Sequence, residues 1–368
     1  MEKSLYFEFV QKYFPQLVTS VVEKIKGSVN GLRPYMYNQY LTKKFSADGR
    51  WASVTAEYTR VAADVVSMDS ELPLKSRDKI ATVEGNIPKS GMKLYISEKE
   101  LKDLDSMIAQ NLPEPQVVQN MFADLPRCIQ GIYERIEDIF LSELSSGVAL
   151  ASRSGGTGVR FDIGFLEKNK FGHGTSDWTN ADTATPLDDI QKVYDQAMDD
   201  QNTITTAFLD DYTIKLLGNS KQVREQFAFN RGLVITAESK VPVLSFDQIA
   251  SIFEDKWQTK LVRVSKTIKT ELNGVKGTHN PWAKGHITFT CYDNLGDLVW
   301  TNVAEVTRPV AGVTYQAADE FILASRYSTN DPLREFTNSQ AMVIPILNNV
   351  DAIYSLSMLK SKYFDHYF

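Results

Sequence analysis

The residues from Asp69 to Ser97 form a charged stretch that is too long for a turn and that lies between two strand-like segments. The segment before it is rich in Val, Thr, Ala and Tyr from about Val54 to Met68, and its own last seven residues, "GMKLYIS", have the composition of a returning strand. The sequence therefore predicts a long two-stranded projection.

This projection contains few large apolar residues. Its charged residues include Lys75, Arg77, Asp78, Lys79, Glu84 and Lys89. Because an isolated two-stranded ribbon is only marginally stable in water, the projection needs a partner, and contact with another copy of the chain is the favoured interpretation. The alternatives are an active-site lid and a disordered insertion, since long loops are usually functional or disordered.

The first 45 residues are basic, with seven Lys or Arg against three acids, whereas the whole chain has a formal net charge of -6. The basic residues are Lys3, Lys12, Lys24, Lys26, Arg33, Lys43 and Lys44. Pro15, Gly27 and Gly31 break this region into short amphipathic pieces. The pattern predicts an arm that docks elsewhere, on an acidic neighbour or near nucleic acid, with an ordinary solvated helical segment as the alternative.

The strongest helical signal runs from Glu114 to about Val148, where apolar residues recur every three or four positions. Pro126 should kink this helix or mark the first turn of a second one, because proline lacks an N–H group. A continuous helix would be up to roughly 50 Å long at about 1.5 Å per residue. Before it, Ser97 with Glu100 forms a capping-box pattern that predicts the start of another helix.

The second half of the chain mixes helices and long strands. Helices are expected from Pro186, near Thr205 to Leu217, and after Ser245. The strands "HITFTCYD" and "DLVWTNVAEVT" are expected to form a hairpin through Asn294 to Gly296. Strict alternation of strand and helix is absent, so the prediction is an α+β fold, and a doubly wound enzyme fold is disfavoured.

The chain contains no recognised catalytic motif. The glycines of "SRSGGTGVRFDIGF" follow a helix and precede a strand, which is the wrong order for a phosphate-binding loop. The spacing of His279, His286 and Cys291 matches no common zinc pattern. We therefore predict no catalytic, cofactor-binding or metal-binding residues, and no enzyme.

The 368 residues, 43% of them hydrophobic, are enough for two compact units. The two cysteines, Cys128 and Cys291, are interpreted as buried free thiols. No apolar run reaches the roughly 20 residues of a membrane span, and the start of the chain lacks the features of a signal peptide. The expected location is a cytoplasm, without a membrane partner.

This order of parts resembles the major capsid proteins of tailed bacteriophages, whose fold is shared with encapsulin shells and herpesvirus capsid floors. The resemblance covers nearly the whole chain by layout. Its specific parts are "ADVVSMDSELPLKSRDKIATVEGNIPKSG", "RIEDIFLSELSSGVAL" with "FDIGF", and "REFTNSQAMVIPILNNVDAIYSL", the last similar to the lambda-like branch.

The resemblance implies five regions. They are an N-terminal arm (1–52), an extended loop (53–100), a peripheral domain with a spine helix at about 114–148 (101–185), an axial domain (186–324), and closing strands with a C-terminal tail that return to the peripheral domain (325–368). In such proteins the extended loop lies across the adjacent subunit of the capsomer, and the arm runs along a neighbour.

The resemblance also implies contact residues. Those of the extended loop are Lys75, Arg77, Lys79, Glu84 and Lys89, and those of the arm, facing a neighbour or the lumen, are Lys24, Lys26, Arg33, Lys43 and Lys44. Some relatives form a Lys–Asn isopeptide bond, for which Lys75, Lys79, Lys89 and Lys93 are candidate donors and Asn338, Asn348 and Asn349 candidate acceptors. The alternative is that these lysines make screened surface contacts.

The function implied is that of a major capsid protein that self-assembles into the hexamers and pentamers of an icosahedral head and encloses double-stranded DNA through weak, non-specific contacts. It would assemble in the bacterial host cytoplasm with a separate scaffolding protein, a portal and possibly a decoration protein, and would reside in the virion capsid. An encapsulin-type compartment shell and a cytosolic enzyme with a long lid loop remain the alternatives.

Overall fold

The computed structural model describes residues 1–27, 35–56, 80–152, 158–172, 177–232, 242–272 and 274–358. The chain forms two compact units, each assembled from separate stretches of sequence. Unit 1 contains 1–52, 84–138 and 297–346, and unit 2 contains 53–83, 139–296 and 347–368. The boundaries expected for the five regions remain predictions.

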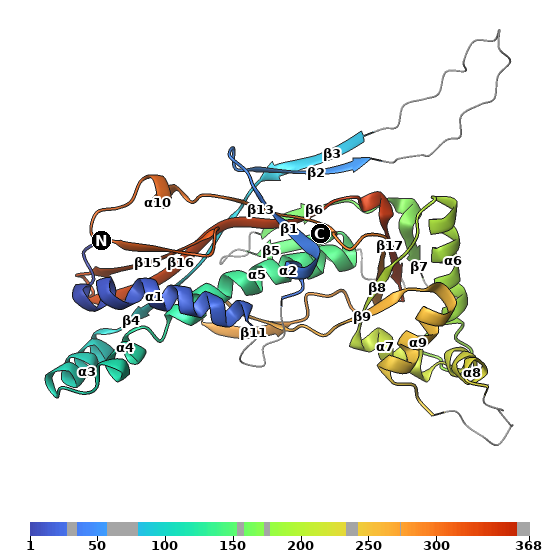
Figure 1. The fold of residues 1–368 in the computed structure, drawn as a ribbon, viewed down its shortest axis with the longest axis horizontal. Coiled ribbons are helices and arrows are strands. Elements are labelled where there is room, and N and C mark those ends of the chain that lie inside the picture. The colour runs from blue at the N-terminus through green and yellow to red at the C-terminus, as the bar shows by residue number, and fades with distance from the viewer. Residues whose placement is uncertain are drawn as a thin grey trace, which may run out of the picture. The chain divides into compact units, whose positions relative to one another are not determined.

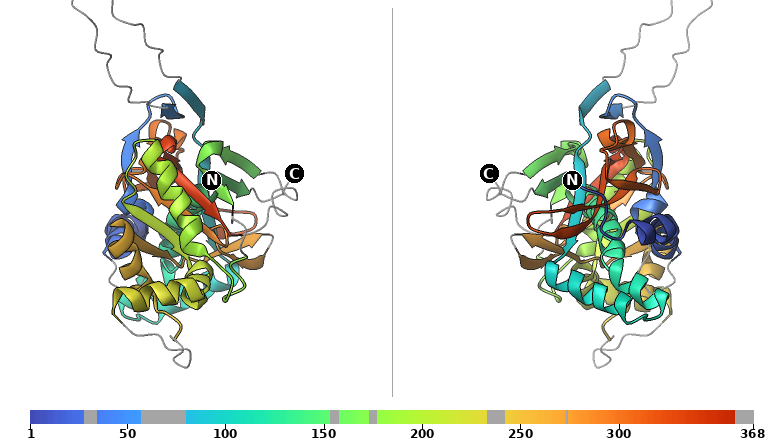
Figure 2. Two further views of the ribbon diagram at one scale, coloured as in Figure 1. Left: turned by 90° about the vertical axis from the view of Figure 1, so that its right-hand side faces the viewer. Right: turned by 90° about the vertical axis from the view of Figure 1, so that its left-hand side faces the viewer.

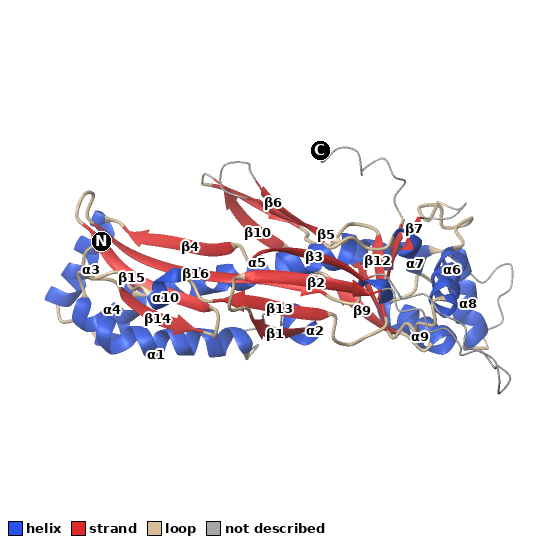
Figure 3. Cartoon of the chain, turned by 90° about the horizontal axis from the view of Figure 1, so that it is seen from above, coloured by secondary structure: helices blue, strands red, loops and turns tan. Residues whose placement is uncertain are grey.

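Unit 1 is built on a six-stranded sheet in the order β1-β13-β16-β15-β14, with β4 paired to β16 beside this path (Figures 1 and 3). The strands are β1 (Leu41–Phe45), β4 (Lys89–Ile96), β13 (Gly296–Thr301), β14 (Thr314–Ala318), β15 (Ile322–Thr329) and β16 (Arg334–Leu347). The helices are α1 (Phe7–Lys26), α2 (Tyr37–Tyr40), α3 (Glu98–Ala109), α4 (Glu114–Met121), α10 (Ala304–Thr307) and the first part of α5 (Leu125–Ser146).

The first part of α5 packs on β16 through paired polar contacts. The Cys128 thiol donates to the carbonyl oxygen of Thr337 at 3.5 Å, and the Ser339 hydroxyl donates to the carbonyl oxygen of Cys128 at 2.6 Å. All three residues are buried, and Cys128 is a free thiol. These contacts satisfy small polar groups that would otherwise be costly to bury between the helix and the sheet.

Helix α1 runs without interruption through Pro15, so the expected break at this proline is wrong. Val10, Phe14, Val18 and Val22 lie on one buried face, and Phe14 stacks on Phe122 with ring centroids 6.2 Å apart. A proline inside a helix costs about 3 kcal/mol, but burying a large apolar side chain contributes about 1.5–3 kcal/mol each. Tertiary burial of this face therefore outweighs the local signal.

Unit 2 is built on a five-stranded sheet in the order β7-β17-β12-β8-β9, with the two-stranded sheets β5-β6 and β10-β11 beside it. The strands are β5 (Val148–Ser152), β6 (Gly158–Asp162), β7 (Lys170–Gly172), β8 (Thr206–Asp210), β9 (Lys260–Val264), β10 (Ile268–Leu272), β11 (Val275–His279), β12 (His286–Thr290) and β17 (Ile353–Ser357). The helices are α6 (Pro186–Asp199), α7 (Asp211–Asn219), α8 (Lys221–Asn230), α9 (Phe246–Trp257) and the rest of α5.

The five-stranded sheet is covered on both faces, as the alternation along β12 shows. Ile287 and Phe289 join the core made with α6, α7 and α9, whose helices lie over one face in Figure 2. Thr288 points the other way and donates to the carbonyl oxygen of Leu144 in α5 at 2.8 Å. The α+β class predicted from the sequence is confirmed, since the chain mixes helices with largely antiparallel sheets.

Several expected elements differ in the structure. The long helical signal is split into α4 and α5, and Pro126 lies in the first turn of α5, which confirms the second of the two expectations. The stretch near Thr205 begins as strand β8, and the helix starts only at Asp211. The expected hairpin of β12 and β13 is wrong because the two strands belong to different sheets.

Candidate functional site

The root of the long projection is held tightly. Strands β2 (Arg50–Ala56) and β3 (Ile80–Asn86) form their own two-stranded sheet, and residues 57–79 lie outside the described residues. The sequence predicts a two-stranded projection but places its returning strand at Gly91–Ser97, whereas β3 lies in the stretch expected between the two strands. Trp51 is buried, and a Cβ atom added at Gly85 would lie 2.9 Å from its indole ring. The N–H of Ile87 donates to the carbonyl oxygen of Gly49 at 2.9 Å, which ties together the two chain segments that flank the hairpin.

We expect Gly85→Ala to destabilise the hairpin root, because the added methyl group must displace the bulky Trp51 ring. Overpacking of this kind costs about 1–3 kcal/mol. Amide hydrogen exchange in β2 and β3 should rise in the variant. Gly131→Ala is the matched control, since its Cβ would meet only the end of the flexible Met92 side chain, at 2.8 Å. Equal exchange in the two variants would contradict this account.

The returning segment contains two strands. After β3, strand β4 leaves the hairpin and pairs with β16 from Lys89 opposite Met342 to Ile96 opposite Glu335, so the expectation that "GMKLYIS" pairs within the projection is wrong. Lys89 lies 2.9 Å from Glu305. Burial would raise the pKa of Glu305, but the hydrogen bond from Lys89 lowers it. β4 therefore anchors the hairpin to the sheet.

The start of the arm is held by a buried ion pair. Arg326 Nε lies 2.9 Å from Glu335 Oε1, and both side chains are 0% exposed. The same carboxylate accepts hydrogen bonds from the Ser4 hydroxyl and from the Leu5 N–H, the latter at 3.1 Å. Arg326 also donates to the carbonyl oxygen of Met121 at 2.9 Å. Buried charges persist only when paired in this way, so Glu335 connects the N-terminal residues to the sheet.

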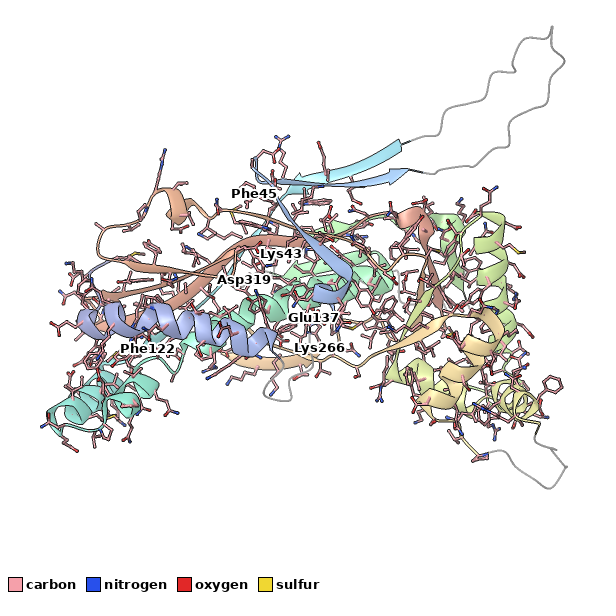
Figure 4. The ribbon with its side chains drawn as sticks, viewed as in Figure 1. Lys43, Phe45, Phe122, Glu137, Lys266 and Asp319 are labelled. Carbon is pink, nitrogen blue, oxygen red and sulfur yellow. The ribbon has the colours of Figure 1, made fainter. Side chains whose placement is uncertain are left out.

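The returning part of the arm is held by two further carboxylates. Glu137 of α5 accepts from the N–H groups of Met36 and Tyr37 at 2.9 and 3.1 Å, which satisfies the first turn of α2. Asp319, in the turn between β14 and β15, lies 3.0 Å from Lys43 (Figure 4). It also lies 3.0 Å from Lys26. The arm is thus bound to its own unit at each described end.

The structure places only some of the predicted contact residues. Lys75, Arg77, Lys79 and Arg33 lie outside the described residues. Glu84, Lys89 and Lys24 are exposed, Lys26 and Lys43 bind Asp319, and Lys44 lies 3.4 Å from Asp297. These ion pairs are within one chain, and the contacts with neighbouring chains remain predictions.

Sequence reasoning missed the acids that receive the arm. Glu335 is the clearest case, since it stands inside the apolar ending of the chain, where an acid must be paired in order to be buried. That signal points to a buried ion pair but names no partner. Glu137 and Asp319 look like ordinary surface acids in the sequence.

The described residues show few features of a catalytic or metal-binding site. No three His, Cys, Asp or Glu side chains among them lie close enough together to hold a metal ion. A cavity of about 320 Å³ lies at the hairpin root and is lined by residues such as Phe45, Trp51 and Val299. None of the described helices combines the length and the apolar surface needed to cross a bilayer.

A family model described as phage major capsid protein E matches residues 55–358. The chain belongs to this family. Because the matching family is a phage capsid family, the protein is a phage major capsid protein with a structural role, and the encapsulin-type alternative is not favoured. No curated protein sequence gives a significant match.

The chain is similar to several solved structures at low sequence identity. A prophage capsid protein of E. coli CFT073 is 12% identical, with a TM-score of 0.57, and the match covers 93% of this chain and 99% of that one. A phage-related protein of Bordetella bronchiseptica is 10% identical, with 93% and 96% covered and a TM-score of 0.49. The mature capsid of bacteriophage PhiM1 gives 8% identity, 89% and 87% coverage and a TM-score of 0.49. The first of these likenesses supports the capsid fold that the sequence predicts for this phage capsid protein.

Proposed function

We propose that this phage major capsid protein self-assembles into the hexamers and pentamers of an icosahedral head, with the β2–β3 hairpin lying across an adjacent copy. One observation carries the proposal. The hairpin root is fixed by Trp51 and by a 2.7 Å hydrogen bond from Ser53 to the carbonyl oxygen of Leu347, yet β2 and β3 pair with no other described strand. A two-stranded ribbon that is anchored at its root and pairs with no other described strand is suited to contact another chain.

The finer features follow from the same proposal. The head encloses double-stranded DNA through weak contacts, because a net charge of -6 does not favour strong phosphate binding. Lys24 and Arg33 of the arm face a neighbour or the lumen, whereas Lys26, Lys43 and Lys44 contact acids of their own chain. Assembly takes place in the bacterial cytoplasm with a separate scaffolding protein, a portal and, where the head carries one, a decoration protein.

A hairpin deletion tests this function. We expect the full chain, with phage lysate proteins added as a source of scaffold if needed, to form closed shells or capsomer rings in negative-stain electron microscopy. Replacing residues 57–79 by a short Asn-Gly turn should leave a folded chain whose light-scattering mass stays that of single chains or small oligomers. The reason is that the turn keeps β2 and β3 joined but removes the contact surface.

A second test compares the removal of positive charge from the hairpin with its removal from another exposed surface. Lys75, Arg77 and Lys79 changed together to Ala should weaken assembly, whereas Lys99 and Lys102 of α3, which are also exposed, should tolerate the same change. Shells from the deletion variant, or folded monomers from the full chain under every condition, would overturn the proposed function.

A further inference from the structure

Strand β1 occupies an edge of the unit 1 sheet while burying little apolar surface. It stands at the end of the strand order and pairs with β13. Residues 42–45 are all exposed, and Phe45, which is 51% exposed, meets Trp300 edge-on with ring centroids 4.8 Å apart. Apolar burial therefore contributes little to its attachment.

Charged contacts hold β1 where apolar contacts do not. Lys43 Nζ lies 3.0 Å from Asp319 and 3.3 Å from Glu320. The Nζ atom of the following residue, Lys44, lies 3.4 Å from Asp297. Asp297 lies within β13 and Asp319 follows β14, so acids from two parts of unit 1 contact the two lysines of β1.

Asp319 differs from the other two acids because its side chain is only 4% exposed, against 58% for Glu320 and 22% for Asp297. Tyr133 donates its hydroxyl to Asp319 Oδ2 at 2.9 Å, and Lys26 Nζ lies 3.0 Å from Oδ1, the atom that Lys43 also contacts. We call Lys26, Lys43, Tyr133 and Asp319 the Asp319 cluster. Solvent screening is weaker for such a carboxylate than for a surface pair, so its hydrogen bonds are stronger.

The cluster joins three separate elements at one carboxylate. Lys26 ends α1, Lys43 lies in β1, and Tyr133 lies in α5. Burial would raise the pKa of Asp319, but the hydrogen bonds from Lys43 and Lys26 lower it. The carboxylate is therefore charged at neutral pH. Without this charge, two lysine side chains would meet with no buried counterion between them.

We propose that Asp319 is an electrostatic latch that keeps β1 on the edge of its own sheet, and that opening this latch frees the edge of β13 for a strand of a second copy of the chain. A sheet edge presents unpaired backbone N–H and C=O groups, which readily take up another strand. The latch itself is inferred from contacts within one chain. Its role in controlling contacts between copies rests on the proposed capsid function.

Amide hydrogen exchange tests the latch directly. Asp319→Asn keeps the shape of the side chain and suits a position whose backbone φ is 62°, since asparagine tolerates this left-handed region. We expect exchange of the β1 amides to rise at least about tenfold, because a charge-assisted hydrogen bond is lost. In the wild-type protein, 1 M NaCl should produce part of the same rise, and in Asp319→Asn it should add little.

The matched control is Glu320→Gln, which removes the neighbouring exposed acid that also contacts Lys43. We expect β1 exchange in this variant within about twofold of wild type, as for exposed pairs in general. If Asp319→Asn unfolds, shown by fast exchange throughout α5, then Lys43→Gln removes the latch from the other side and should give the rise in β1 alone.

Two results would overturn the latch: unchanged β1 exchange in Asp319→Asn with α5 still protected, or equal effects of Asp319→Asn and Glu320→Gln. Exchange is measured within the chain, so these results are independent of shell formation. If the latch is confirmed but wild type and Asp319→Asn assemble identically, the role of the β13 edge between copies is wrong, while the capsid function stands.

Discussion

Replacing Arg326 with methionine should lower the free energy of unfolding by about 3–5 kcal/mol, because it leaves Glu335 buried with its charge uncompensated. Both side chains are fully buried, and the carboxylate is the acceptor for Ser4 and Leu5. The guanidinium also lies over the Phe122 ring, 4.5 Å from its centroid. Urea denaturation followed by circular dichroism would measure the loss.

A double variant tests whether the loss of stability comes from the unpaired charge of Glu335. Combining Arg326→Met with Glu335→Leu removes both charges, and we expect most of the lost stability to return, because replacing a buried ion pair by apolar residues is often neutral. The exposed pair Lys12–Glu114, 2.8 Å apart, is the surface control, and Lys12→Met should leave the free energy of unfolding close to that of wild type. The account fails if the double variant is less stable than Arg326→Met.

In the double variant, attachment of the N-terminal arm should respond differently from global stability. Glu335→Leu with Arg326→Met removes the acceptor of the Leu5 N–H, so the contact at residues 4–5 is lost even where global stability is restored. The apolar face of α1, with Val10 and Phe14 at 0% exposure, remains in place. Stability and arm attachment are therefore separable at this site.

Elements with local signals were predictable from the sequence. The capping box of Ser97 and Glu100 begins α3, and that of Ser245 and Gln248 begins α9, because both motifs satisfy backbone groups within one turn. The existence of a two-stranded projection was also predictable from its charged composition, but its returning strand was not, since β3 and not Gly91–Ser97 pairs with β2.

Strand partners were not predictable, because pairing depends on residues far away in the sequence. β12 and β13 follow each other closely and look like a hairpin, yet β12 pairs with β8 and β17 while β13 lies between β1 and β16. The same holds for the acids of the site. Asp319 reveals its role only when the fold brings Lys26 and Lys43 to it.

A buried acid in α5 should make the stability of the chain depend on pH. Glu143 is 0% exposed, neither of its side-chain oxygens has a hydrogen-bond partner among the described residues, and burial raises its pKa well above the usual value of 4.5. The folded chain therefore binds this proton more tightly than the unfolded chain does. Its contribution to stability is complete below the usual pKa and is lost as the pH rises towards the folded value, with a slope of at most about 1.4 kcal/mol per pH unit.

Two substitutions of Glu143 separate its charge from its polarity. Glu143→Gln cannot ionise, so its unfolding free energy should lack this part of the decline above pH 5, as urea denaturation at a series of pH values would show. Glu143→Leu also removes the unpaired oxygens and should stabilise the chain by about 1–3 kcal/mol at neutral pH, because an unsatisfied buried polar group costs that much.

Glu98→Gln, at a carboxylate that is 62% exposed, should leave the pH profile as in wild type. If Glu143→Gln keeps the wild-type slope, another group causes it, and if Glu143→Leu is destabilising, the carboxyl group has a partner that supports the folded state.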